Sequence, residues 1–182
     1  LWSGLLRRVV TASDAVYEGG KGSAGFLCVA DPGKSEETRL GRVIRIPERL
    51  YSIWGPRITY IAQLELLAVL VAITEAAELV RGSSSVWFID NVAALMALVK
   101  GSSGSHSLDQ MAKIIHLACF AIHSVPYFEY VESKANWADE ISRVGAQGNW
   151  ASNNAFSVNE CGVAIELLTL PSLAVVKIFE HL

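Results

Sequence analysis

Residues 8–30 read RVVTASDAVYEGGKGSAGFLCVA, and this stretch decides the fold. Arg8 to Ala15 predicts an apolar strand, the glycine-rich run from Glu18 to Gly22 predicts its turn, and Gly25 to Ala30 predicts a second strand. Thr38 to Ile46 alternates well enough to predict a third strand. Three consecutive strands joined by short turns indicate an antiparallel meander.

Helices and strands then alternate along the chain. Ile61 to Val80 is the strongest helical stretch, because it is rich in Ala and Leu, lacks Gly and Pro, and is followed by a Gly82 cap signal. The further elements expected are a strand at Ser85 to Ile89, a helix at Asn91 to Lys100, a helix at Leu108 to His123, a strand at Val125 to Val131 and a helix at Asn136 to Arg143. This order predicts an α/β fold with a mixed five-stranded sheet, its three antiparallel strands first, flanked by helices.

The size of the chain favours one hydrophobic core. With 182 residues, 52% of them hydrophobic, we expect a single domain over residues 1–145. Residues 146–182 are treated as a C-terminal tail of uncertain structure. Within it, Val163 to Leu182 is either one helix broken at Pro171 or two short segments.

Charge and cysteine content exclude several classes of protein. The formal net charge of -3 provides no global basic field, so any nucleic-acid contact must come from local Lys and Arg groups. Cys28, Cys119 and Cys161 lack the paired spacing of a zinc site or a disulfide framework. The longest apolar run, Leu64 to Ile73, contains Glu65 and is too short for a membrane span. We therefore expect a soluble intracellular protein with no membrane contact.

Two acidic residues stand at unusual places in the first half of the chain. Asp14 lies near the end of a strand predicted to be central, where a turn aspartate is the alternative explanation. Glu65 is surrounded at helical spacing by apolar residues, so its carboxylate is expected to need a cation or a hydrogen-bonding cluster. Escape of the Glu65 side chain to solvent at the edge of the apolar stripe is the alternative.

Two further acids follow later elements. Asp90 lies at a strand-to-helix junction, where helix capping by Asp90 or by Asn91 is the alternative explanation. Asp139 lies three residues after Asn136, an arrangement similar to a capping box. Together, two acids at the ends of neighbouring strands and two on helices predict a convergent carboxylate site. Such a site is able to hold two divalent cations roughly 3.5–4 Å apart, which is the arrangement used for cleaving phosphodiesters.

Four segments in order resemble the RNase H domain of reverse-transcribing retroelements, as found in retrotransposon polyproteins, within the RNase H-like superfamily. They are Ser13-Asp14-Ala15 with Gly22 to Phe26, then Gln63 to Ala68, then Phe88 to Ala94, and finally Asn136 to Arg143. The resemblance covers about residues 8–143 and implies an RNase H-like fold.

By this resemblance, Asp14, Glu65, Asp90 and Asp139 take the positions of the family's catalytic, metal-binding acids. The implied reaction is hydrolysis of the RNA strand of an RNA–DNA hybrid with two Mg²⁺ ions, for which Mn²⁺ is a substitute. Four more residues are implied to lie at the substrate: Gly22 and Ser23 in a hairpin, Asn91 against the backbone or sugar, and Trp137 beside Asp139.

The sequence also departs from the family pattern. Many members carry a His-containing loop before the last acid, whereas this chain runs from Val131 to Asn136 without His, which puts the role of that His in doubt here. Five arginines, Arg39, Arg42, Arg45, Arg49 and Arg57, predict at most a modest basic surface, with solvated charge on an edge strand as the alternative.

Three functional hypotheses follow. The first is an active ribonuclease domain, assisted by a covalently linked or neighbouring reverse transcriptase domain and located in the cytoplasm, the nucleus or a retroelement particle. The second is a catalytically inactive RNase H-like scaffold or nucleic-acid-binding module, which the four acids disfavour. The third is a transposase, integrase or exonuclease, which the order of the acids disfavours.

Overall fold

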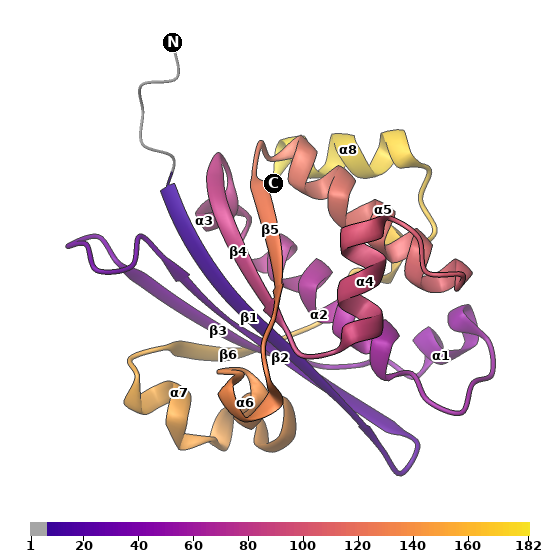
Figure 1. Ribbon diagram of the computed structural model, residues 1–182, viewed down its shortest axis with the longest axis horizontal. Helices are drawn as coiled ribbons and strands as arrows, with labels where there is room; N and C mark the ends of the chain where they lie inside the picture. Colours follow the sequence, from indigo (N-terminus) through magenta and orange to yellow (C-terminus); the bar gives the residue numbers. More distant parts are fainter. Residues whose placement is uncertain (1–6) are drawn as a thin grey trace.

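The computed structural model describes residues 7–182, and within them the strands form one six-stranded sheet (Figure 1). Its order is β5-β4-β1-β2-β3-β6. The strands are β1 (Arg7–Glu18), β2 (Lys21–Ala30), β3 (Thr38–Ile44), β4 (Ser83–Ile89), β5 (Val125–Tyr130) and β6 (Ser157–Cys161). β1, β2 and β3 form the antiparallel meander, and β4 and β5 add in parallel beside β1. The mixed α/β fold with three antiparallel strands first is confirmed.

Two helical layers hold the sheet between them. The helices are α1 (Arg49–Trp54), α2 (Ile61–Glu75), α3 (Ala77–Val80), α4 (Val92–Lys100), α5 (His106–Ala121), α6 (Asp139–Val144), α7 (Asn149–Asn153) and α8 (Ser172–His181), with 3-10 turns η1 (Ser133–Ala135), η2 (Gly145–Gln147) and η3 (Ile165–Leu168). The larger core lies between the sheet and the layer of α2, α4, α5 and α8. A smaller core, which includes Ala12, Leu27 and Ile141, lies under α6 and α7. Figure 1 shows α6 and α7 apart from the long helices.

The prediction of five strands is corrected to six. β6 pairs in parallel with β3, from Leu40 opposite Ser157 to Ile44 opposite Cys161. The five residues of β6, SVNEC, are mostly polar and partly exposed, so they carry no apolar alternation from which a strand is predicted. β3 is therefore an inner strand and not an edge strand.

The predicted turn at Glu18 to Gly22 is also corrected. Gly19 and Gly20, with φ of 58° and 81°, form the turn, and Gly22 and Ser23 lie inside β2. Gly22 is needed for close packing, because a Cβ atom there would lie 2.6 Å from the hydroxyl oxygen of Tyr51 and 2.7 Å from a methyl carbon of Leu64. The sequence shows the glycines but not which of them needs a left-handed backbone.

The predicted helix from Ile61 to Val80 is two helices. α2 ends at Glu75 and α3 begins at Ala77, with Ala76 outside helical geometry at ψ 21°. Alanine is a strong helix former, so no local signal marks this break.

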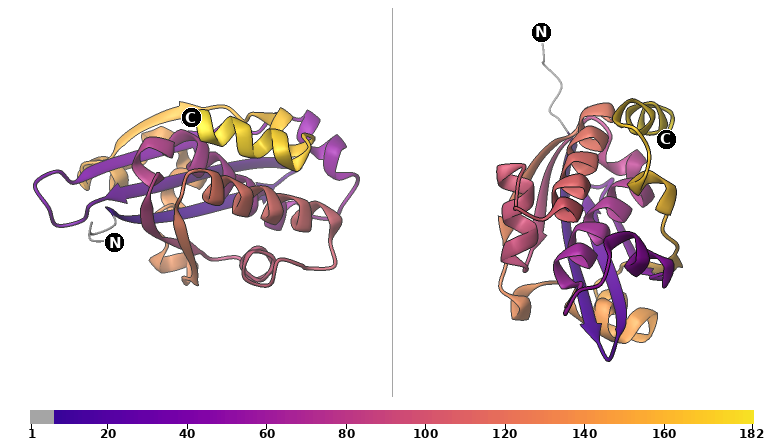
Figure 2. Two further views of the ribbon diagram at one scale, coloured as in Figure 1. Left: turned by 90° about the horizontal axis from the view of Figure 1, so that it is seen from above. Right: turned by 90° about the vertical axis from the view of Figure 1, so that its right-hand side faces the viewer.

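The last part of the chain packs on the same sheet and core. Val175 and Phe179 of α8 are fully buried, and α8 packs against α5, beside which it runs in the left view of Figure 2. Pro171 separates η3 from α8, as one of the two alternatives for this region predicted. Whether residues 1–145 fold without the tail stays a prediction.

Carboxylates neutralise most of the predicted basic surface. The side chains of Arg39, Arg42, Arg45 and Arg49 pair with Glu37, Glu75, Glu160 and Glu166, in that order. Arg57 instead donates to the hydroxyl of Ser107 over 3.0 Å. This part of the molecule therefore offers little free positive charge to a phosphate backbone.

Two further observations concern the apolar segments and the cysteines of residues 7–182. None of the helices there has the length and apolar character needed to cross a membrane. Cys28, Cys119 and Cys161 are all free thiols, the first two of them buried.

Candidate active site

Three secondary-structure elements bring Asp14, Glu65 and Asp90 to one place. β1 and β4 are parallel neighbours with Ala12 opposite Phe88, so Asp14 and Asp90, each two residues further on, come side by side. Glu65 lies in the first turns of α2, which packs across β1 and β2. One carboxylate oxygen from each residue lies within 4.8 Å of one from each of the others.

Burial makes this cluster electrostatically costly. Asp14 and Glu65 are 3% and 1% exposed. The pKa of Asp14 is raised to about 7, first by loss of water and then by the negative charges of Asp90 and Asp139, against the opposing hydrogen bond from Ser142. Burial, with the neighbouring Asp14 and Asp90 charges, also raises the pKa of Glu65 well above its ordinary value. Three adjacent carboxylates in such surroundings favour binding of either protons or cations.

The two carboxylate oxygens of Glu65 differ in their contacts. Oε1 accepts a hydrogen bond of 3.1 Å from the backbone N–H of Ala15. Oε2 is buried and has no hydrogen-bond partner anywhere in residues 7–182. A buried carboxylate oxygen without a donor is expensive, so this atom needs a ligand.

A divalent cation fits this donor set. The available atoms are carboxylate oxygens, which Mg²⁺ and Mn²⁺ prefer, and no soft sulfur or imidazole donor belongs to the cluster. A cation bound among Asp14, Glu65 and Asp90 would give Oε2 of Glu65 a partner and would offset the mutual repulsion of the three charges. These residues are three of the four acids whose convergence the sequence predicted.

Asp139 lies beside this cluster but does not belong to the group of three. It begins α6, and its Oδ1 accepts a hydrogen bond of 2.9 Å from Nε of Arg143. Arg143 also lies 3.8 Å from a carboxylate oxygen of Glu18. The structure thus brings three of the four predicted acids together, with Asp139 at the rim and paired with an arginine.

Two residues that the sequence analysis did not assign to the site hold this arrangement together. The Ser142 hydroxyl donates to the carboxylate of Asp14 and also lies 2.9 Å from the carbonyl oxygen of Asp139. Asn136 is buried, and its side-chain amide donates to the carbonyl oxygen of Ser13 over 2.9 Å. The position of Ser142 one helical turn after Asp139 was the available signal, because residues three apart on a helix share a face.

The predicted substrate contacts have defined positions. Asn91 caps α4, its Oδ1 accepting a 3.0 Å hydrogen bond from the N–H of Ala94, as one alternative for this residue predicted. The Ser23 hydroxyl donates to the carbonyl oxygen of Ser142 over 2.5 Å and thereby ties β2 to α6. Contact of Asn91, Gly22 and Ser23 with a substrate stays a prediction.

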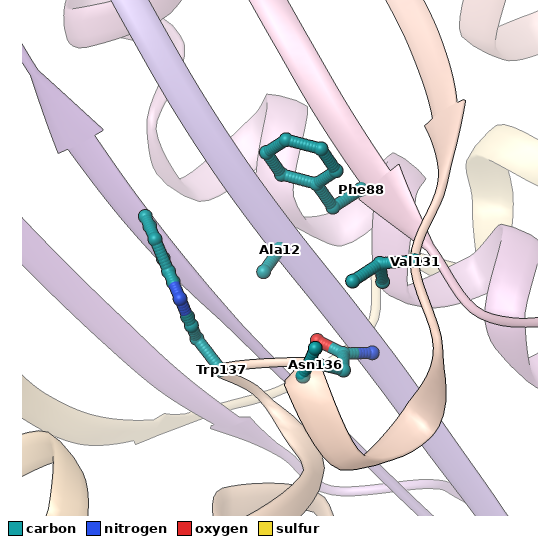
Figure 3. A pocket seen from close by; sticks show the side chains of 6 residues that line it. Ala12, Phe88, Val131, Asn136 and Trp137 are labelled. Atoms are coloured by element: carbon teal, nitrogen blue, oxygen red, sulfur yellow. The ribbon is translucent and has the colours of Figure 1, made fainter.

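Trp137 is 38% exposed, two residues before Asp139. It lines a pocket of about 440 Å³ together with Lys134, Asp139 and Glu140. A smaller pocket on its other side is lined by Ala12, Phe88, Val131 and Asn136, and Figure 3 shows Trp137 and Phe88 on either side of Ala12. Trp137 therefore stands at the edge of the acidic site in an accessible position.

Comparison with known proteins gives a match at the level of structure. No family model and no curated protein matches the sequence. RNase H1 from the halophilic archaeon Halobacterium salinarum has 17% identity and a TM-score of 0.54, over 76% of this chain and 96% of that one. LC9-RNase H1, described as a type 1 RNase H with the type 2 active-site motif, has 16% identity and a TM-score of 0.53, over 85% and 87%. The chain therefore has the RNase H-like fold.

Proposed function

We propose that this protein is a metal-dependent endoribonuclease that hydrolyses the RNA strand of RNA–DNA hybrids. The observation that carries the proposal is the convergence of Asp14, Glu65 and Asp90 within 4.8 Å, with one buried Glu65 oxygen lacking a partner. The RNase H-like fold that positions this cluster also supports a nuclease function. A purely structural role gives no reason to bury the carboxylates of Asp14 and Glu65 beside that of Asp90, because each buried charge costs several kcal/mol without a partner.

The residues have distinct proposed roles. Asp14, Glu65 and Asp90 are the proposed ligands of divalent cations, either Mg²⁺ or Mn²⁺. Asp139, at the rim of the cluster, is the proposed fourth ligand once its hydrogen bond with Arg143 is broken. The chemistry that two bound cations would supply at these carboxylates is activation of a water molecule and stabilisation of the leaving oxygen of the phosphodiester. Ser142 and Asn136 are positioning residues, because they fix Asp14 and the loop before Asp139 without facing the substrate.

Recognition of the hybrid is proposed to use groups around the cluster. The Asn91 side-chain nitrogen is available to a sugar or phosphate oxygen, since its Oδ1 already caps α4. Recognition of a 2′-hydroxyl distinguishes RNA from DNA at such a contact. Ser23 and Gly22 lie opposite Val16 and Tyr17 in the β1–β2 ladder, a few residues along β1 from Asp14, and we propose that they border the path of the hybrid.

A reverse transcriptase is the proposed partner, and a retroelement polyprotein the proposed source. This partner and source are supported by a sequence resemblance to the retroelement enzymes. The resemblance lies in four short segments, around Asp14, Glu65, Asp90 and Asp139. The formal charge of -3 and the pairing of four arginines with glutamates agree with a domain that relies on a neighbour to hold the nucleic acid.

Substrate selectivity tests the proposed function. The purified chain is incubated with a labelled RNA–DNA hybrid, double-stranded RNA and double-stranded DNA of one sequence, in Mg²⁺, in Mn²⁺ and with a chelator. Cleavage of only the RNA strand of the hybrid, abolished by the chelator, is expected. If a folded chain binds hybrid without cutting it in either metal, the inactive scaffold is the better account.

A further inference from the structure

An aromatic platform lies on the α6 and α7 side of the sheet. It consists of Trp137, Trp150 and Phe156, with the guanidinium of Arg39 above Phe156 at 5.7 Å from the ring centroid. The Trp137 and Trp150 rings are 6.3 Å apart at 24°, and the Trp150 and Phe156 rings are 6.1 Å apart at 30°. Both tryptophans are 38% exposed. The rings therefore form an ordered, nearly parallel series whose indoles remain accessible.

The protein holds this platform in place. The backbone N–H of Trp150 donates to Oε2 of Glu140 over 2.6 Å, which fastens α7 to α6. Arg39 donates to Glu37 and to the carbonyl oxygen of Asn154, so its guanidinium is fixed over Phe156. Rings that are positioned before binding lose little conformational entropy when a ligand stacks on them.

Trp137 lines two larger hollows. One of about 350 Å³ is lined by the whole platform together with apolar residues of β1 and β2 and the polar side chains of Glu37 and Asn154. The other, of about 440 Å³, is shared with Lys134 and Asp139. Aromatic walls with a few polar groups at the edges suit a flat aromatic ligand that also forms hydrogen bonds. Both hollows also have volumes within the range of about 300–1,000 Å³ that is typical of ligand sites.

We infer that this platform binds an unpaired nucleobase of a single-stranded segment that extends beyond the hybrid. The inference rests on the proposed function, since Asp139 borders both the acidic cluster and the hollow beside Trp137. A strand that leaves the cluster past Asp139 meets Trp137 next, with Lys134 at the rim to face a phosphate. Bases in a duplex stack on one another, so only an unpaired base has a free face for an indole.

Binding measurements test the inference separately from catalysis. Fluorescence anisotropy compares a blunt hybrid with hybrids that carry unpaired extensions at each end, and a single strand alone, all in chelator so that no cleavage occurs. The unmodified protein is expected to bind an extended hybrid more tightly than the blunt one. The double substitution Trp137→Leu and Trp150→Leu is expected to remove that preference, a loss of about 5- to 150-fold for one stacked base, equivalent to about 1–3 kcal/mol.

Matched variants make the test specific. Trp137→Phe, which keeps a flat ring, is expected to retain most of the preference. Tyr127→Leu on β5 removes an even more exposed aromatic ring outside these hollows and is expected to leave the preference unchanged. Thermal melting verifies that each variant is folded.

Four results would overturn the inference. The first is equal affinity of the unmodified protein for blunt and extended hybrids, and the second is an unchanged preference in the folded double variant. The third is a dimer of the unmodified protein that the double variant abolishes, which would make the platform a contact between copies. Absence of cleavage in Mg²⁺ would instead count against the proposed nuclease and not against base stacking, which is measured without metal. Tight binding of a free mononucleotide by Trp137 and Trp150 would show a nucleotide site and contradict the single-strand assignment.

Discussion

Asp14 and Glu65 are carboxylates in surroundings that penalise their charge, and the contacts around them show how the chain tolerates this. Ser142 donates to Asp14, and the N–H of Ala15 donates to Glu65. These two hydrogen bonds leave Oε2 of Glu65 without a partner within residues 7–182. At the scale of single residues, the site is therefore organised for an additional positive ligand.

Replacing Ser142 by Ala is expected to lower the rate of hybrid cleavage about tenfold. The hydroxyl stabilises the ionised form of Asp14, and a hydrogen bond to a charged group contributes about 1.5–3 kcal/mol. The variant is expected to need more Mg²⁺ for half-maximal rate, because Asp14 is then a poorer cation ligand. Initial rates over a Mg²⁺ titration measure this, with Ser152→Ala on the exposed side of α7 as the control. Unchanged Mg²⁺ dependence would remove Ser142 from its positioning role.

Replacing Glu65 by Gln is expected to stabilise the metal-free protein near neutral pH. The raised pKa of Glu65 means that the folded state either carries a costly charge or takes up a proton that the unfolded state does not hold, and Gln avoids both costs. Mg²⁺ is expected to raise Tm of the unmodified protein by about 2–4 °C or more, and that of the variant much less. Melting curves with chelator and with Mg²⁺ decide this. The exposed Glu78→Gln serves as the control, and an equal Mg²⁺ response in both variants would contradict a cation site at Glu65.

At the scale of elements, α6 depends on a glycine in the neighbouring strand. Gly25 lies opposite Asp14 in the β1–β2 ladder, and a Cβ atom there would lie 2.8 Å from Cγ1 of Ile141 and 3.1 Å from the carbonyl oxygen of Arg42. Only a residue without a side chain lets α6 approach the sheet closely enough for Ser142 to reach Asp14.

Gly25→Ala is therefore expected to destabilise the fold by about 1–3 kcal/mol and to lower activity at the same time. Urea unfolding measures the first effect and hybrid cleavage the second. Gly162→Ala is the matched control, because a Cβ atom there has nothing within 4 Å. Normal stability of Gly25→Ala would show that α6 shifts without cost.

Much of the element pattern was predictable, and the exceptions have physical causes. Some signals are local in the sequence: the alternation of the strands, the Ala- and Leu-rich composition after Ile61 and the Gly101 cap of α4. They were sufficient to locate the first five strands and three long helices. β6 was not, because five mostly polar residues become a strand only by pairing with β3. The break at Ala76 likewise comes from packing and not from propensity.

The candidate site was partly predictable for a related reason. Each of the four acids had a local explanation of its own, and only the combination of a strand end, an apolar helix face and a second strand end indicated convergence of Asp14, Glu65 and Asp90. The contacts of Ser142 and Asn136 span more than 120 residues in the chain, so the neighbouring sequence does not identify their partners, although the spacing of Ser142 from Asp139 puts both on one helix face. The same holds for the pairing of Trp137 with Trp150, which depends on how α7 docks.

At the scale of the whole molecule, the C-terminal segment is part of the packed structure. Phe179 of α8 is completely buried in the larger core beside α5, although it is far in sequence from the meander. Phe179→Ala is expected to lower the free energy of unfolding by about 3–5 kcal/mol, because it removes a large buried ring and leaves a cavity.

Urea denaturation checks this value. Leu173→Ala on the same helix is the control, since Leu173 is 67% exposed and its loss should cost little. If both variants unfold at the same urea concentration as the unmodified protein, α8 does not contribute to the cooperative core, and residues 1–145 fold as an independent domain.

The central claim is that the acidic cluster cuts RNA paired with DNA. The most direct test is the initial rate of RNA-strand cleavage in a hybrid with Mg²⁺ for the unmodified protein, for Asp14→Asn and for Asp90→Asn, each verified as folded. We predict cleavage by the unmodified protein and a loss of at least about 100-fold in both variants, because Asn offers a neutral and weaker ligand to a hard cation. Cleavage that persists in both variants, or its absence in the folded unmodified protein, would contradict the account.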